Sequence, residues 1–268
     1  MNTGFIGAGK MAEAMIGALV RSASAARGQI LVSDVDPARI ERLASLYGTQ
    51  GFRDNRHVAA NCRVLVLAVK PQQLDAVLAE IAPAVTTEHL VISIAAGKRI
   101  ATFEAALPGA RVVRVMPNVA SLVAEGMSVF TLGLHATEDD RRTAADLLQT
   151  FGRVLELPEA QFDAVTALSG SGPAFFALFL QELANAAVGE GLKPDDALLL
   201  AEQTMLGTAR LLLDRRQTPD ELITSVTSAR GTTAAGLEVL RAPAFSRLLK
   251  ETIAAAARRS RELSRISS

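Results

Sequence analysis

A short glycine-rich turn near the N-terminus constrains the fold more than any other feature of the chain. The turn reads Gly7-Ala8-Gly9-Lys10-Met11-Ala12 and lies between an apolar, strand-like segment and a helix-like stretch. Glycine at the first position permits a tight turn, and glycine at the second lets a ligand approach the backbone closely. The helix that follows offers N–H donors and a partial positive charge, which suit the pyrophosphate of a dinucleotide.

Asp34 supplies the second element of this pattern. It ends the second predicted strand, at the spacing of about 20 residues that dinucleotide-binding units show. A carboxylate there can accept a hydrogen bond from a ribose 2′-hydroxyl, whereas it repels a 2′-phosphate unless a cation lies nearby. Arg39 is a candidate cation, with a solvated surface charge as the equal alternative. The pattern predicts a dinucleotide site, and an ordinary glycine-rich turn is the weaker interpretation.

The first half of the chain alternates strand-like and helix-like segments. Continuous apolar runs such as residues 63–69 suit parallel strands that helices cover on both faces. We therefore predict an α/β fold whose N-terminal Rossmann dinucleotide-binding domain spans residues 1–157. Strands are expected at residues 4–7, 29–34, 63–69, 90–95, 111–116, 127–132 and 154–157, and helices at 10–25 and 37–47.

The second half has a different character and contains no convincing strand. We predict an all-helical C-terminal dimerisation domain over residues 158–268. Residues Pro173–Leu180 are apolar on every side of a helical wheel, so a helix there must be covered all round. The segment is too short to span a membrane, and we expect it to lie inside a subunit interface. Helices are expected at 173–189, 195–213, 218–225, 232–240 and 245–263.

Composition excludes several functional classes. Lys+Arg and Asp+Glu are both 28, and a net charge of zero argues against a general nucleic-acid binder. The single cysteine, Cys62, cannot form an internal disulfide or a thiolate metal site, and we expect no metal. No signal-like segment precedes the first strand, and no apolar run reaches the ~18 residues needed to cross a bilayer. These observations favour a cytoplasmic protein that has no membrane or nucleic-acid partner.

The helical half lacks the usual groups for proton transfer. From Pro158 onward it contains no His, Cys or Tyr, whereas enzymes that act on alcohols usually move a hydroxyl proton. A protonated imine needs less help, because its nitrogen already carries the proton. The small-residue segments Leu168–Pro173 and Thr227–Thr233 each lead into a helix. Their N–H groups can hold a carboxylate, and plain helix capping by Ser or Thr is the alternative.

Six stretches, taken in order, resemble the pyrroline-5-carboxylate reductase family from end to end of the chain. The resemblance implies reduction of 1-pyrroline-5-carboxylate to L-proline, the last step of proline biosynthesis. It implies NADPH as the cofactor, with NADH as the alternative, and a homodimer that can assemble further. The active site would then lie between the cofactor domain and helices from both subunits. The stretches are FIGAGKMA (Phe5–Ala12), LAVKPQ (Leu67–Gln72), SIAAG (Ser93–Gly97), RVMPN (Arg114–Asn118), ALSGSGPAF (Ala167–Phe175) and GTT (Gly231–Thr233).

The same resemblance assigns roles to individual residues. Thr233 matches the catalytic threonine whose hydroxyl meets the substrate nitrogen. The loop that contains Ser228 binds the substrate, and Gly231 and Thr232 would offer backbone N–H groups to its carboxylate. Ala95 and Ala96 would lie near the nicotinamide. The remaining cofactor residues implied are Ile6, Gly7, Ala8, Gly9, Lys10, Met11, Asn55, Ala68, Val69, Lys70 and Pro71, beside Asp34.

The sequence departs from the family in two places. The family commonly has Ser-Pro-Gly-Gly before the threonine, and this chain has Ser228-Ala229-Arg230-Gly231. Arg230 replaces a residue that tolerates positive φ, and it adds a cation beside the expected carboxylate site. Asn118-Val119-Ala120 also lacks the usual Thr-Pro after the asparagine. The sequence alone therefore does not define the geometry of the substrate loop.

Two other functions remain as alternatives. A 3-hydroxyacid dehydrogenase shares a Rossmann domain followed by helices, but it places a lysine on the helix after a glycine-rich turn. The predicted helix at residues 173–189 carries Gln181, Glu182 and Asn185 and no lysine. A non-catalytic dinucleotide sensor is the second alternative, which the fold alone does not exclude.

Overall fold

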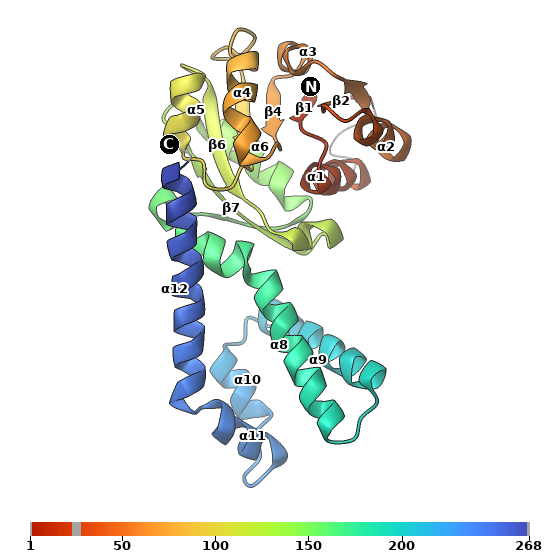
Figure 1. Cartoon of the computed structure of the whole chain (residues 1–268), viewed down its shortest axis with the longest axis vertical. Coiled ribbons are helices and arrows are strands. Elements are labelled where there is room, and N and C mark those ends of the chain that lie inside the picture. Colours follow the sequence, from red (N-terminus) through yellow and green to blue (C-terminus); the bar gives the residue numbers. More distant parts are fainter. Residues whose placement is uncertain (1, 23–27, 267–268) are drawn as a thin grey trace. The chain divides into compact units, whose positions relative to one another are not determined.

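A computed structural model describes residues 2–22 and 28–266. Its first part is an α/β unit built on an eight-stranded sheet of order β3-β2-β1-β4-β5-β6-β7-β8 (Figure 1). Neighbouring strands run parallel except for the antiparallel pair β6 and β7. The strands are β1 (Thr3–Ile6), β2 (Ile30–Ser33), β3 (Gln50–Phe52), β4 (Val64–Leu67), β5 (Leu90–Ser93), β6 (Arg111–Met116), β7 (Gly126–Leu132) and β8 (Gly152–Glu156).

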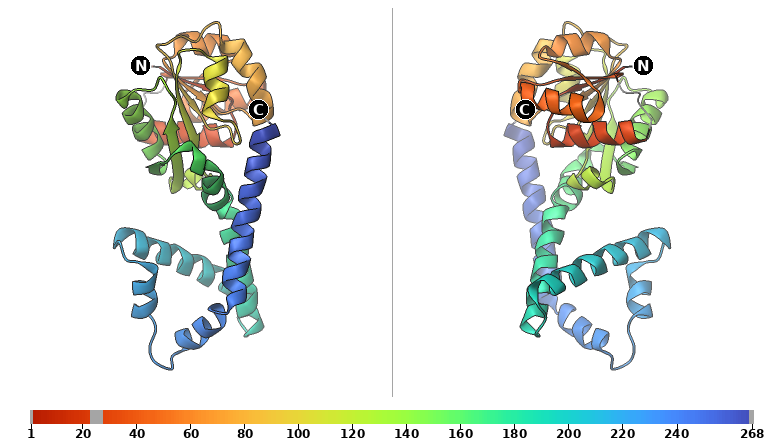
Figure 2. Two further views of the ribbon diagram at one scale, coloured as in Figure 1. Left: turned by 90° about the vertical axis from the view of Figure 1, so that its left-hand side faces the viewer. Right: turned by 90° about the vertical axis from the view of Figure 1, so that its right-hand side faces the viewer.

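Alternate residues of the parallel strands enter two separate cores. In β4, Val64 and Val66 belong to one apolar cluster, and Leu65 and Leu67 belong to the other. Helices cover both faces of the sheet, which confirms the predicted doubly wound α/β arrangement (Figure 2). The helices of this unit are α1 (Lys10–Arg21), α2 (Pro37–Tyr47), α3 (Asn55–Asn61), α4 (Pro71–Ile81), α5 (Ile100–Ala106) and α6 (Glu138–Gln149).

Several strands end earlier than the sequence suggested. The predicted strands at 29–34, 63–69 and 90–95 stop at Ser33, Leu67 and Ser93. The next residues, such as Ala68 and Ile94, each donate one more hydrogen bond to the neighbouring strand before the chain turns away at the carboxyl edge of the sheet. The predicted helix at 10–25 is observed to Arg21, and residues 23–25 of that prediction lie outside the described residues.

The chain divides into two compact units. One contains the residues up to Ser171 together with those from Ala256 onward, and the other is Gly172–Ala255. The second unit is helical throughout, as predicted for this half of the chain. A boundary at residue 158 stays a prediction. The helices are α8 (Gly172–Gly189), α9 (Pro194–Asp214), α10 (Pro219–Ser225), α11 (Thr232–Leu240) and the larger part of α12 (Pro243–Ile266).

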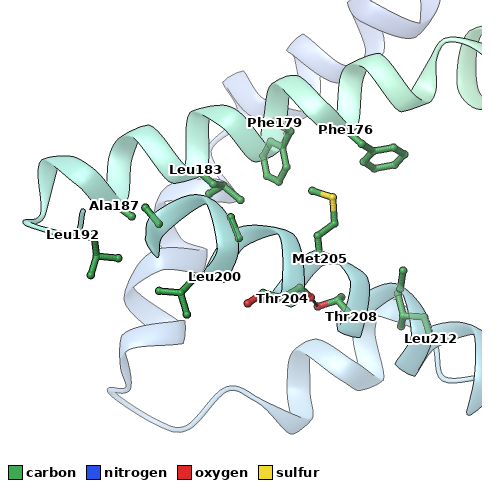
Figure 3. A pocket seen from close by; sticks show the side chains of 13 residues that line it. Phe176, Phe179, Leu183, Ala187, Leu192, Leu200, Thr204, Met205, Thr208 and Leu212 are labelled. Atoms are coloured by element: carbon green, nitrogen blue, oxygen red, sulfur yellow. Dashed lines mark hydrogen bonds between the residues drawn. The ribbon is translucent and has the colours of Figure 1, made fainter. Parts of the chain in front are cut away.

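The helical unit has almost no core of its own. Of residues 172–255, all of which the structure describes, only Gly172, Ala184 and Ala197 are buried. An apolar groove of about 630 Å³ runs between α8 and α9, where the side chains of Phe179 and Met205 approach each other (Figure 3). Phe176 is 59% exposed, and apolar surface of this extent marks an interaction site.

The expectation that no apolar segment is long enough to cross a bilayer is wrong. The helical stretch Glu159–Gly189 is long and apolar enough to cross a membrane by length and composition. The sequence appeared interrupted at Ser169-Gly170-Ser171. In the structure the backbone continues through that break as a π-helix, Thr166–Gly170, between α7 (Phe162–Val165) and α8. Length and composition are weak evidence for a span, because interface and core helices pass the same test.

Candidate functional site

The glycine-rich turn has the backbone geometry that its sequence predicts. Gly7 has a φ of +101°, and a Cβ built there would lie 2.8 Å from the carbonyl carbon and oxygen of Ala68. Only glycine fits both constraints. Gly9 is the N-cap of α1 with no side-chain cap, and nothing lies within 4 Å of a Cβ built on it. The first N–H groups of α1 therefore have no side-chain cap at Gly9, and there is open space on that side of the turn.

Asp34 binds the turn directly. Its Oδ2 accepts a hydrogen bond from the Ala8 N–H at 2.7 Å, and its Oδ1 accepts one from the Asp36 N–H at 2.9 Å. Arg39 lies beside both carboxylates, with Nη1 3.7 Å from Asp34 Oδ2 and Nε 3.3 Å from Asp36 Oδ2. The Asp34 side chain is 7% exposed, so it positions the turn as well as bordering the space beyond it.

A cavity of about 590 Å³ opens at the carboxyl ends of β1, β2 and β4. The strand order reverses between β1 and β4, and dinucleotides bind at such a switch point. One wall comes from α4, a helix that was not among those predicted from the sequence. The signal was the LAVKPQ stretch, because a helix that begins at Pro71 must present a face to the same edge. The predicted residues that line the cavity are Gly7, Gly9, Asp34, Asn55, Ala68, Val69 and Lys70, together with the candidate cation Arg39, and the unpredicted ones are Ser33, Val35, Asp36, Gln72, Gln73, Ala76, Val77 and Glu80.

The other predicted cofactor residues lie around this cavity without lining it. Ile6 ends β1 and is buried, as is Ala8. Lys10 and Met11 begin α1, and Pro71 begins α4. Ala95 is buried and Ala96 is exposed in the loop after β5, at the same edge of the sheet. Their contacts with a cofactor stay predictions.

Asn55 is held by the protein itself. Its Nδ2 donates to Glu80 Oε2 at 2.7 Å, which joins the start of α3 to the end of α4. The amide therefore has a fixed orientation at the cavity wall.

Among the residues that the structure describes, no group of three or more His, Cys, Asp or Glu side chains can hold a metal ion. Burial raises the pKa of the Cys62 thiol to about 11, so Cys62 stays protonated and is a poor nucleophile at neutral pH.

The predicted substrate loop lies in the helical unit and forms a closed turn. The Gly231 N–H donates to the Ser228 carbonyl oxygen at 3.0 Å. Arg230, the third residue of this turn, has a φ of +61°. A positive φ at that position is the mark of a type II turn, which normally carries glycine there. The chain has therefore kept the turn that Ser-Pro-Gly-Gly would form and placed an arginine in it.

Helix α11 begins directly after this turn. Its N-cap is Gly231, which makes no side-chain capping hydrogen bond, and Thr232 and Thr233 are its first two residues. Helix capping by a hydroxyl therefore does not explain the threonines here. A Cβ built on Gly231 would collide with Ser228 Oγ and lie 3.2 Å from the Ser228 carbonyl oxygen, so a larger residue there would force the serine side chain to move. The first N–H groups of α11 have no side-chain cap from Gly231 and are available to a carboxylate.

Two family models match the chain. Residues 159–263 match the pyrroline-5-carboxylate reductase dimerisation family, which supports homo-oligomerisation. Residues 2–97 match the coenzyme F420-dependent NADP oxidoreductase family. Pyrroline-5-carboxylate reductase 3 of Rattus norvegicus is 41% identical over 98% of this chain and 96% of its own length. Pyrroline-5-carboxylate reductase of Methanosarcina acetivorans is 40% identical over 97% of both.

Solved structures give the same result. A pyrroline-5-carboxylate reductase from Coxiella burnetii has a TM-score of 0.94 and 34% identity, with 98% of each chain covered. The Plasmodium falciparum enzyme, with NADP bound, has a TM-score of 0.86 and 27% identity over 98% of each chain. These similarities extend over both compact units of the chain.

The strained Arg230 gives a stability prediction. Left-handed backbone costs a non-glycine residue about 1–2 kcal/mol, and part of that is returned because glycine is more flexible in the unfolded chain. Arg230→Gly should therefore raise the free energy of unfolding by about 0.5–1 kcal/mol, measured by denaturant titration. Ala229→Gly is the matched control at an ordinary φ and should lower it. Equal losses in both variants would contradict the assigned turn.

Proposed function

The chain belongs to the pyrroline-5-carboxylate reductase family, and we propose that it reduces 1-pyrroline-5-carboxylate to L-proline with a reduced nicotinamide cofactor. The observation that carries the proposal is identity of about 40% to such reductases over nearly the whole chain. The reaction would be the last step of proline biosynthesis. A 3-hydroxyacid dehydrogenase is the weaker candidate, because no lysine occurs in α8.

The cofactor supplies a hydride to the imine carbon, and the chain holds the two reactants. The turn at Gly7–Gly9 and the uncapped start of α1 fit a pyrophosphate, since a side chain at Gly7 would fill the space that the backbone needs. The Thr232 N–H would bind the substrate carboxylate. The Gly231 N–H, which the sequence also assigned to the carboxylate, instead donates to the Ser228 carbonyl oxygen and closes the turn. The Thr233 hydroxyl oxygen would accept a hydrogen bond from the protonated imine nitrogen. That proton stays on nitrogen as the N–H of the neutral amine that hydride addition forms, and the amine then takes up a second proton from solvent.

NADPH is the cofactor that we assign, with NADH as the second candidate. Family membership supports NADPH. The local charges oppose it, because Asp34 and Asp36 border the cavity where a 2′-phosphate would lie, and Arg39 is the cation between them. Arg39 is 54% exposed, and its guanidinium would turn from these two carboxylates toward a phosphate.

A steady-state assay with 1-pyrroline-5-carboxylate and each cofactor tests both parts of this proposal. We expect cofactor absorbance to fall on addition of the imine, with a larger kcat/KM for NADPH than for NADH. A 3-hydroxyacid with the oxidised cofactor is the negative control. A folded preparation that binds NADPH without consuming it would refute the activity and favour a dinucleotide sensor. A clear advantage for NADH would show that the Asp34 carboxylate sets the preference.

We also propose that the working unit is a homodimer that can assemble further. In this scheme residues 1–157 form the cofactor domain, and residues 158–268 form the dimerisation and substrate domain. The exposed groove between α8 and α9 supports this, because a second copy would cover Phe176 and its apolar neighbours.

We assign the enzyme to the cytoplasm, which cell fractionation tests, because its one cysteine is free.

Light scattering at micromolar concentration should give a dimer or a larger even-numbered assembly. Leu200→Glu, on the exposed part of the groove, should shift the assembly toward monomer, because a buried carboxylate has no partner there. Leu134→Glu is the matched control, on an exposed leucine outside the helical unit. A well-folded wild-type monomer would contradict the proposal.

Thr233 should act through its hydroxyl. Losing one hydrogen bond to the reacting group costs about 1–3 kcal/mol, or roughly tenfold to a hundredfold in rate. Thr233→Val should therefore lower kcat/KM by that factor, whereas Thr233→Ser should retain most of it. Thr232→Val is the matched control, because Thr232 is assigned a backbone contact only. If Thr233→Val lowers the melting temperature and leaves kcat/KM unchanged, Thr233 is structural.

A further inference from the structure

Lys98 is a charged side chain that the fold removes almost completely from solvent. It is 2% exposed, and its Nζ donates to both carboxylate oxygens of Asp75, at 2.7 Å and 3.0 Å. Burying an ammonium group carries a desolvation penalty that even a well-formed ion pair often does not fully offset, and a well-packed hydrophobic residue of similar volume is often at least as stable. A lysine is therefore retained here at a cost that a hydrophobic residue would avoid, and this points to a positional requirement.

The ion pair joins two elements at the cofactor edge of the sheet. Lys98 lies in the loop between β5 and α5, three positions after Ala95. Asp75 lies on α4, where the flanking residues Gln73 and Ala76 line the cavity. The loop after β5 is thereby tied to the helix that forms one cavity wall.

The last turns of α12 hold the same loop from another side. A Cβ built on Gly97, which has a φ of +75°, would lie 3.7 Å from Leu263 and 3.8 Å from the Ser264 backbone nitrogen. The end of α12 therefore lies beside the loop that leads into α5 (Figure 1). Ser260 fixes this end of α12 by donating to Asp163 Oδ1 at 2.6 Å. All of these residues belong to the sheet unit.

Strand order indicates which part of the cofactor this loop faces. A residue at the end of β2 meets the adenosine ribose in dinucleotide folds, and Asp34 is that residue here. The other half of the cofactor then crosses the switch point between β1 and β4 and extends over β4 and β5. We propose that Lys98 is a positioning residue, whose ion pair with Asp75 holds Ala95–Gly97 in the conformation that receives the nicotinamide ring. This inference rests on the proposed function.

The test compares two ligands, each measured by calorimetry without the imine. NADPH has both halves of the cofactor, and 2′-phospho-ADP-ribose lacks only the nicotinamide. Lys98→Met should weaken NADPH about tenfold and leave the fragment within about twofold. It should also lower kcat by roughly tenfold to a hundredfold, because a misplaced reactant loses its orientation. Lys98→Arg should recover most of the NADPH affinity.

Asp75→Asn tests the pair from the other side. Asp75 is 70% exposed, and the asparagine amide oxygen can still accept a hydrogen bond from Lys98 Nζ, so this variant should fold even if Lys98→Met does not. It should also weaken NADPH selectively, because the charge that holds Lys98 is lost. Arg111→Met is the matched control. Arg111 Nη1 lies 2.9 Å from Asp140 Oδ1, at the start of β6 and the opposite edge of the sheet. It should lower the melting temperature without changing the ratio of the two affinities.

Two results would overturn the inference. One is an unchanged NADPH affinity in both Lys98→Met and Asp75→Asn. The other is an equal loss for NADPH and the fragment, which would show a general loosening of the cofactor domain. Both results come from binding measurements alone. Failure of the proposed function would instead give a wild-type enzyme that binds NADPH but does not reduce the imine, so the two failures can be told apart.

Discussion

The cofactor site depends on the close approach of three backbone segments at the switch point, namely those that end β1, β2 and β4. The Gly7 N–H donates to the Ser33 carbonyl oxygen at 2.8 Å, and the Ala68 N–H donates to the Ile6 carbonyl oxygen at 2.8 Å. These bonds extend the parallel ladders beyond the last strand residues and bring three chain segments together. A side chain at Gly7 would separate them, because its Cβ would overlap the Ala68 carbonyl. Asp34 then completes the turn through the Ala8 N–H. The open start of α1 and the cavity beside it follow from this arrangement.

Sequence patterns predicted the elements whose signal is local. The helices from α8 to α11 lie within about a residue of their predicted bounds, because Pro, Thr or Gly near their ends marks where they begin or stop. β3, with the sequence Gln-Gly-Phe, was missed because its residues are mostly exposed and it has no apolar run. The Lys98–Asp75 pair could not be predicted, since its partners are 23 positions apart and only the packing of α4 against the loop after β5 brings them together. The return of α12 to the sheet unit is likewise a tertiary property.

Arg230 shows how a departure from a family pattern can leave geometry unchanged. The sequence left the loop open, because arginine disfavours the left-handed conformation that glycine adopts readily. The structure keeps the turn, with φ +61° at Arg230 and the Gly231-to-Ser228 hydrogen bond closed. Ala229 cannot restrict φ as proline would, so the turn is held by the Gly231-to-Ser228 hydrogen bond and by the packing around it. The turn is thus formed at an energetic cost, with an arginine in the left-handed conformation at its third position.

The poor core of the helical unit links stability to function. Residues 172–255 bury little of their apolar surface within one chain, and the groove between α8 and α9 remains open. A unit of this kind gains its stability from association, so its folding depends on protomer concentration. The same unit carries the turn at Ser228–Gly231 and the start of α11. In the proposed enzyme, the association that covers Phe176 and its neighbours is therefore also what keeps the substrate loop ordered. Catalysis needs this order because the imine must be held in a precise position. Residues 158–268 contain no histidine or cysteine that could assist the reaction if the imine were held less precisely.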